Sequence, residues 1–126
     1  MTVRQLRVVV EAADYDAAVA FFRDTLGLPE EEAYADGDAR VMILGAGRAT
    51  LEIANPAQKR MIDDVEVGRQ VAPAIRLAFE VDDAAAATDA AVAGGAGLVA
   101  APTRTPWRSL NSRLAAPAGL HITLFA

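Results

Sequence analysis

The pattern of apolar positions predicts two similar β-strands, one near the N-terminus and one in the second half of the chain. They lie in segments 7–14 and 76–83, at a constant offset of 69 residues, and Arg, Glu and Asp recur in register between them. Every second residue of each segment is apolar: Val8, Val10 and Ala12 in the first, and Leu77, Phe79 and Val81 in the second. Because alternate residues of a strand share a face, each strand should bury one face under the helix that follows and leave the other for polar chemistry.

A helix is predicted after each of these strands. Asp14 and Asp83 each suit an N-cap, because a carboxylate there accepts hydrogen bonds from the free amides of the first turn. The first helix should run to about residue 26 and end at Gly27. An apolar stripe at helical spacing supports it: Tyr15, Val19, Phe22 and Leu26. The second helix is alanine-rich, is predicted from propensity and capping, and stops at Gly94-Gly95.

Each predicted helix is followed by segments typical of strands. The expected strands are 32–35, 39–44 and 48–53 in the first half, and 98–101, 107–115 and 120–125 in the second. Turn signals at Asp36-Gly37 and Pro117-Ala118-Gly119 separate two of these pairs. Each half therefore reads βαβββ, and the fold class is expected to be α+β.

Length and composition bound the class of protein. The 126 residues suit one domain, with module one at about 1–54, a linker or partly helical flap at 55–74, and module two at 75–126. A net charge of −5 argues against a nucleic acid or an anionic membrane surface as partner. The chain has no cysteine, which excludes disulfides and thiol nucleophiles. Without a signal-peptide pattern or an apolar run of ~18 residues, a cytoplasmic protein is expected.

Four pieces of sequence, in order along the whole chain, resemble the vicinal-oxygen-chelate superfamily of glyoxalases, bleomycin-resistance proteins and extradiol dioxygenases. They are DYDAAVAFFRDTLGL at 14–28, FEVDD at 79–83, TPW at 105–107 and APAG at 116–119. The resemblance implies two βαβββ modules that close around a cleft, with their polar strand faces inward. It also implies a homodimer.

In metal-using members of this superfamily four side chains, typically two His and two Glu, converge on the cleft. The resemblance places these positions at Arg7, Glu52, Arg76 and Thr123, of which only Glu52 is a family-type ligand. Arginine is always protonated and has no acceptor, so it cannot bind a cation. Glu52 and the nearby His121 are fewer than the three or four protein ligands usual in a tight site. We therefore predict no functional metal and no other cofactor.

The altered positions allow two interpretations. In one, Arg7 and Arg76 form an internal ion pair with Glu52 that fills the former metal space. In the other, the surplus positive charge binds the carboxylate or phosphate of a ligand. His121, the only histidine, and Glu52 are the candidates for acid–base catalysis, although a lone strand histidine is also typical of a hydrogen-bonded wall.

The only tryptophan, Trp107, is predicted on a late strand, either stacking on a planar ligand or packing in the core or a dimer interface. Three arginines near it, Arg104, Arg108 and Arg113, are expected to form either a basic rim or, in preference, a solvated strand edge.

Three functions follow from these features. The leading one is a metal-independent small-molecule-binding protein, which the resemblance likens to bleomycin-resistance proteins that sequester a bulky or aromatic ligand. Its predicted ligand-binding residues are Arg7, Glu52, Arg76, Trp107, His121 and Thr123. The alternatives are an enzyme related to glyoxalase-like lyases, isomerases or dioxygenases that uses a degenerate site, and a non-catalytic interaction module.

Overall fold

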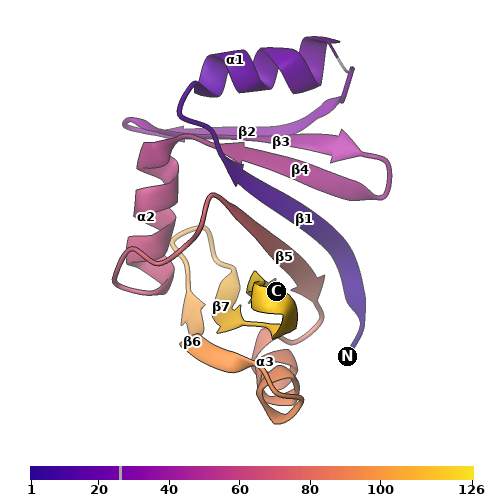
Figure 1. The fold of residues 1–126 in the computed structure, drawn as a ribbon, viewed down its shortest axis with the longest axis vertical. Coiled ribbons are helices and arrows are strands. Elements are labelled where there is room, and N and C mark those ends of the chain that lie inside the picture. Colours follow the sequence, from indigo (N-terminus) through magenta and orange to yellow (C-terminus); the bar gives the residue numbers. More distant parts are fainter. Residues whose placement is uncertain (26) are drawn as a thin grey trace.

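The computed structural model describes residues 1–25 and 27–126 (Figure 1). Its strands are β1 (Val3–Glu11), β2 (Glu30–Asp36), β3 (Ala39–Ala46), β4 (Ala49–Ala54), β5 (Ile75–Val81), β6 (Gly97–Arg104), β7 (Leu110–Ala115) and β8 (His121–Phe125). Its helices are α1 (Tyr15–Val19), α2 (Pro56–Glu66) and α3 (Ala84–Ala93), with a π-helical segment η1 (Ala20–Thr25) and a 3-10 turn η2 (Pro117–Gly119).

The strands form one curled sheet in the order β2-β3-β4-β1-β5-β8-β7-β6, which confirms the predicted α+β class. Each half repeats one pattern, because β1 runs parallel to β4 as β5 runs parallel to β8. The halves meet where β1 and β5 pair antiparallel. In that pairing Arg7 lies opposite Ala78, and Val9 lies opposite Arg76. The offset of 69 residues relates Arg7 to Arg76 and Val9 to Ala78, so each of these pairs is equivalent to the other. The sequence repeat is therefore also a structural repeat.

Both predicted N-caps are confirmed. The Asp14 carboxylate accepts from the Ala17 amide at 3.1 Å, and the Asp83 carboxylate accepts from the Ala86 amide at 3.0 Å. The first helix is regular only to Val19 and then widens into η1, so it differs from the single α-helix that was predicted. The predicted helix residue Leu26 lies outside the described residues.

Each helix covers one apolar face of its own half. In the second half the buried cluster includes Val81 of β5 with Ala84 and Ala87 of α3, and Leu77 and Phe79 of β5 are partly buried against it, as the alternation predicted. In the first half the cluster is built differently, from the following residues: Tyr15, Val19, Met42, Leu44 and Ile53, with Ala12 partly buried against them. The helix of that half thus packs mainly on β3 and β4 rather than on β1.

The strand predicted at 107–115 is wrong at its start, since β7 begins only at Leu110. Residues 105–109 form a loop that Thr105 closes, because its hydroxyl accepts from the Ser109 amide at 3.1 Å. Arg108 has a φ of 72° there, a left-handed conformation that cannot continue a strand. Trp107 consequently sits on an exposed loop.

The linker contains an 11-residue helix, α2, which confirms the prediction of partial helicity. Asn55 caps it by accepting from the Gln58 amide at 2.8 Å. The helix contacts β3 and β4 of one half and β6 and β7 of the other, and Figure 1 shows it standing beside the sheet between the two halves. It is thus a packed bridge between the modules rather than a flap. None of the described helices has the length and apolar content needed to cross a membrane.

Candidate functional site

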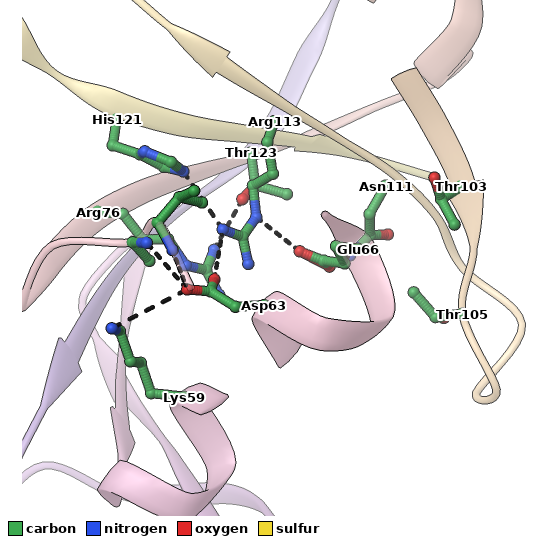
Figure 2. Close-up of polar contacts among 12 residues, drawn as sticks. Lys59, Asp63, Glu66, Arg76, Thr103, Thr105, Asn111, Arg113, His121 and Thr123 are labelled. Atoms are coloured by element: carbon green, nitrogen blue, oxygen red, sulfur yellow. Dashed lines mark hydrogen bonds and ion pairs between the residues drawn. The ribbon is translucent and has the colours of Figure 1, made fainter. Parts of the chain in front are cut away.

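A buried arginine, Arg113 of β7, is the centre of a polar network between α2 and the second half of the sheet (Figure 2). Its side chain is 0% exposed. Its Nε donates to Glu66 Oε1 at 2.7 Å and its Nη1 donates to Asp63 Oδ1 at 2.8 Å. Asn111, two residues earlier on the same strand face, donates to Glu66 Oε2 at 2.6 Å. Two carboxylates from one helix are therefore held by one strand.

Asp63 is fixed from several sides. Its Oδ2 accepts from the backbone amides of Val71 and Ala72, both at 2.9 Å, and Lys59 lies 3.9 Å from the same oxygen. Burial raises the pKa of Asp63, but these two amides and the Arg113 guanidinium outweigh burial and bring the pKa below its ordinary value of 3.8. The carboxylate is thus ionised at neutral pH. It ties the end of the linker to both α2 and β7.

His121 of β8 touches the same network, since its Nε2 lies 3.3 Å from Arg113 Nη1. Burial, and then the positive charges of Arg113 and Arg76, lower the pKa of His121 below its ordinary value of 6.5. The ring is therefore neutral at pH 7, and Nε2 accepts from the guanidinium. The partner of this ring is thus Arg113, a residue that the sequence did not bring together with it.

The four positions that correspond to the superfamily's metal ligands form two arginine-centred pairs. In the first half Arg7 Nη1 lies 3.4 Å from Glu52 Oε1, and in the second half Arg76 Nη1 donates to Thr123 Oγ1 at 2.8 Å. Arg7 also donates to Gln5 Oε1 at 2.9 Å, and its guanidinium carbon lies 5.1 Å from the centre of the Phe125 ring. The structure thus separates the two arginines: one has a carboxylate partner and the other a neutral hydroxyl.

The two halves also differ one strand further out. Thr123 pairs with Arg113 in the β7–β8 ladder, and the corresponding pair in the first half is Glu52 with Ile43 in the β3–β4 ladder. Ile43 is buried, as Arg113 is. Only the second half therefore carries a charged residue at this register position.

A small cavity lies where these groups meet. The volume of the cavity is about 20 Å³. Its lining residues are Val9, Glu11, Glu52, Ala54, Gln58, Lys59, Ile62, Asp63, Ala72, Pro73, Ala74, Arg76 and Arg113. Two of the predicted ligand-binding residues, Glu52 and Arg76, face it. Trp107 does not line it and is 48% exposed.

The sequence matches the glyoxalase-like domain family over residues 7–125. The chain belongs to that family. A comparison with curated proteins gives no significant match. Solved structures, however, show the same fold.

The methylmalonyl-CoA epimerase of Mycobacterium tuberculosis has a TM-score of 0.65 and 23% identity to this glyoxalase-like domain, over 98% of this chain and 85% of that one. A hypothetical protein from Bacillus halodurans has a TM-score of 0.70 and 11% identity, over 98% and 92% of the two chains. A mutant of Streptomyces coelicolor 4-hydroxymandelate synthase has a TM-score of 0.62 and 22% identity. That match covers 97% of this chain and 37% of the synthase chain, so this chain spans well under half of its length. The fold is that of the vicinal-oxygen-chelate superfamily.

The residues of this glyoxalase-like domain do not fit the divalent metal that many members of the superfamily use. A cation at the four corresponding positions would face two guanidinium groups, and Glu52, the one carboxylate there, already pairs with Arg7. Over residues 1–25 and 27–126, no three His, Cys, Asp or Glu side chains are grouped so that they could hold a metal ion.

Sequence reasoning misplaced Arg113 and missed its partners Asp63, Glu66 and Asn111. Arg113 was expected on a basic rim or a solvated edge, but it is fully buried, whereas Arg104 and Arg108 are exposed. Alternation along the strand was the available signal, since Asn111 and Arg113 share a face that is opposite to that of Leu114. The carboxylates lie about 50 residues away in a segment whose packing the pattern did not define.

Proposed function

We propose that this glyoxalase-like domain is a metal-independent small-molecule-binding protein, related in function to bleomycin-resistance proteins that sequester a bulky or aromatic ligand. The observation that carries the proposal is that Arg76, at a position where the superfamily has a metal ligand, lines a cavity instead. The walls of the cavity carry both carboxylates and guanidinium groups, and the guanidinium donors suit an organic ligand with acceptor atoms rather than a cation.

The size of the cavity bears on how such a ligand would bind. About 20 Å³ admits only a small group, so most of a bulky ligand would lie outside the cavity of one chain. We therefore propose a homodimer whose second chain completes the cleft. Light scattering coupled to size-exclusion chromatography tests this part: a mass of one chain at micromolar concentration would contradict it.

A thermal-shift screen followed by calorimetry tests the binding function. The panel contains aromatic antibiotics, small carboxylates, and zinc, nickel and iron ions. We expect an organic compound to raise the melting temperature and to bind with a defined stoichiometry. A metal ion bound stoichiometrically through Glu52 would overturn the metal-independent part. No stabilising compound at all would favour an interaction module instead.

One observation favours an enzyme as the second candidate. Glu52 lines the cavity and uses only one carboxylate oxygen, Oε1, in its contact with Arg7. A carboxylate facing a bound ligand can act as a general base. Incubating the protein with each stabilising compound in deuterated water, and following exchange or turnover by NMR, separates the two: catalysis that Glu52→Gln abolishes supports the enzyme.

A further inference from the structure

The cavity is lined by a guanidinium that lacks an ion pair. Arg76 donates one hydrogen bond, from Nη1 to Thr123 Oγ1 at 2.8 Å. Among the described residues no carboxylate oxygen lies within 4.0 Å of its guanidinium nitrogens. Its Nε and Nη2 have no hydrogen-bond partner among those residues either. One edge of a planar, charged donor group is therefore available to a ligand.

A second guanidinium, that of Arg113, lies beside the same cavity. Arg113 Nη2 is buried and has no hydrogen-bond partner in the described part of the chain, although Nε and Nη1 of the same side chain are well bonded. Since Nη2 has less than 1 Å² of accessible surface, Arg113 contributes its positive charge to the cavity rather than a hydrogen bond to a ligand.

Two of the three carboxylates that line the cavity have partners. Asp63 accepts from Arg113, Val71 and Ala72, and Glu52 pairs with Arg7. Arg76 also lies beside the positive charge of Arg113, and burial, followed by this charge, lowers the pKa of Arg76 from the ordinary arginine value. An anion that enters the cavity would meet a cation with no competing anion in contact.

We infer that this cavity binds the carboxylate group of an organic acid, with Arg76 as its donor. The inference rests on the proposed binding function and names the chemical class of the ligand. An arginine edge offers two parallel N–H groups that match the two oxygens of a carboxylate. The rest of the acid would extend past Gln58, Pro73 and Ala74, which line the same cavity.

The cavity favours a carboxylate over a phosphate for two reasons. A space of about 20 Å³ suits the smaller, planar group better than a tetrahedral one. Glu11, Glu52 and Asp63 also line the space, and their negative charges oppose a dianion more strongly than a monoanion.

Calorimetric titration of the full chain with matched pairs of acids and amides tests the inference. The probes are propionate against propionamide and 3-phenylpropionate against 3-phenylpropionamide, with inorganic phosphate as a third anion. We expect each acid to bind, its amide to bind at least about tenfold more weakly, and phosphate to bind no better than the amides. Equal binding of acid and amide, or tighter binding of phosphate, would overturn the inference.

Variants show whether Arg76 is the residue responsible. Arg76→Gln should weaken acid binding by at least about tenfold, and Arg76→Lys, which keeps the charge but loses the paired donors, should be intermediate. Arg48→Gln is the matched control, because Arg48 is exposed at the turn between β3 and β4. Unchanged acid binding by Arg76→Gln would contradict the inference. Should that variant not fold, the comparison of acids with amides on the native chain decides.

These outcomes separate the two proposals. If the acids do not bind but a neutral compound of the thermal-shift panel does, the carboxylate inference fails while the binding function stands. If no compound of either panel binds, both fail.

Discussion

Arg113 Nη1 and Asp63 Oδ1 lie 2.8 Å apart, and neither side chain is exposed to solvent. One residue comes from the last half of the sheet and the other from the helix that links the modules. A buried pair of this kind adds little by itself compared with apolar residues, but removing one partner leaves the other charge buried and uncompensated. The pair therefore holds the linker in place more than it raises total stability.

Replacing the arginine should be costly. Arg113→Met leaves the carboxylates of Asp63 and Glu66 without their main partner, and we expect a loss of about 3–5 kcal/mol in the free energy of unfolding. Urea unfolding measures it. Arg104→Gln, at an exposed arginine, is the control and should change this free energy by less than about 0.5 kcal/mol. A similar small change for both variants would show that the network does not anchor α2.

The first-half ion pair should matter much less. The side chains of Arg7 and Glu52 are 22% and 18% exposed, and Arg7 Nη1 lies 3.4 Å from Glu52 Oε1. Solvent screening makes such pairs weak, so Arg7→Ala should lower the free energy of unfolding by about 0.2–1 kcal/mol. The same denaturation experiment measures it. A loss as large as that of Arg113→Met would mean that Arg7 belongs to the buried network.

Stability should depend on pH through His121. In the folded chain the pKa of His121 lies below 6.5, whereas in the unfolded chain it is about 6.5. Between these two values the unfolded chain binds more protons, so the contribution of His121 is complete above about pH 6.5 and is lost as the pH falls toward the folded pKa. The urea midpoint, measured at steps from pH 7.5 to 4.5, should fall more steeply for the native chain than for His121→Gln. Parallel curves would contradict the lowered pKa.

The caps of the helices should differ in strength. Asp14 accepts one backbone hydrogen bond, whereas Asn55 accepts from the Gln58 and Arg40 amides and donates to the Asp38 carbonyl at 2.6 Å. Asp14→Ala should therefore cost about 1 kcal/mol, and Asn55→Ala should cost more, up to about 2 kcal/mol. Thermal and urea unfolding of both variants measure the order. The reverse order would show that Asn55 acts only as a local cap.

Sequence periodicity was sufficient to predict the repeated strand–helix pattern, because it depends on local signals such as Asp14, Asp83 and the alternation in β5. The family resemblance, rather than periodicity, is what directed attention to Arg76 and Glu52, which line the cavity. Periodicity did not reveal that Arg113 is buried, because an arginine is expected at the surface unless the acidic side chains that pair with it are known. Those carboxylates, Asp63 and Glu66, lie in a linker whose position depends on tertiary packing rather than on a local pattern. Trp107 was placed on a strand because nothing in the sequence signalled the left-handed Arg108.

The difference between Arg113 and Ile43 has a consequence for how this protein can be changed. A duplicated chain has two equivalent halves but only one linker, so a single α2 can supply carboxylates to only one of them. A chimera built from two copies of the second half would bury one arginine with no acid to meet it. A linker taken from a relative that lacks acidic residues at positions 63 and 66 would likewise leave Arg113 buried without a carboxylate partner. Any recombinant of this chain therefore has to keep α2 and β7 together.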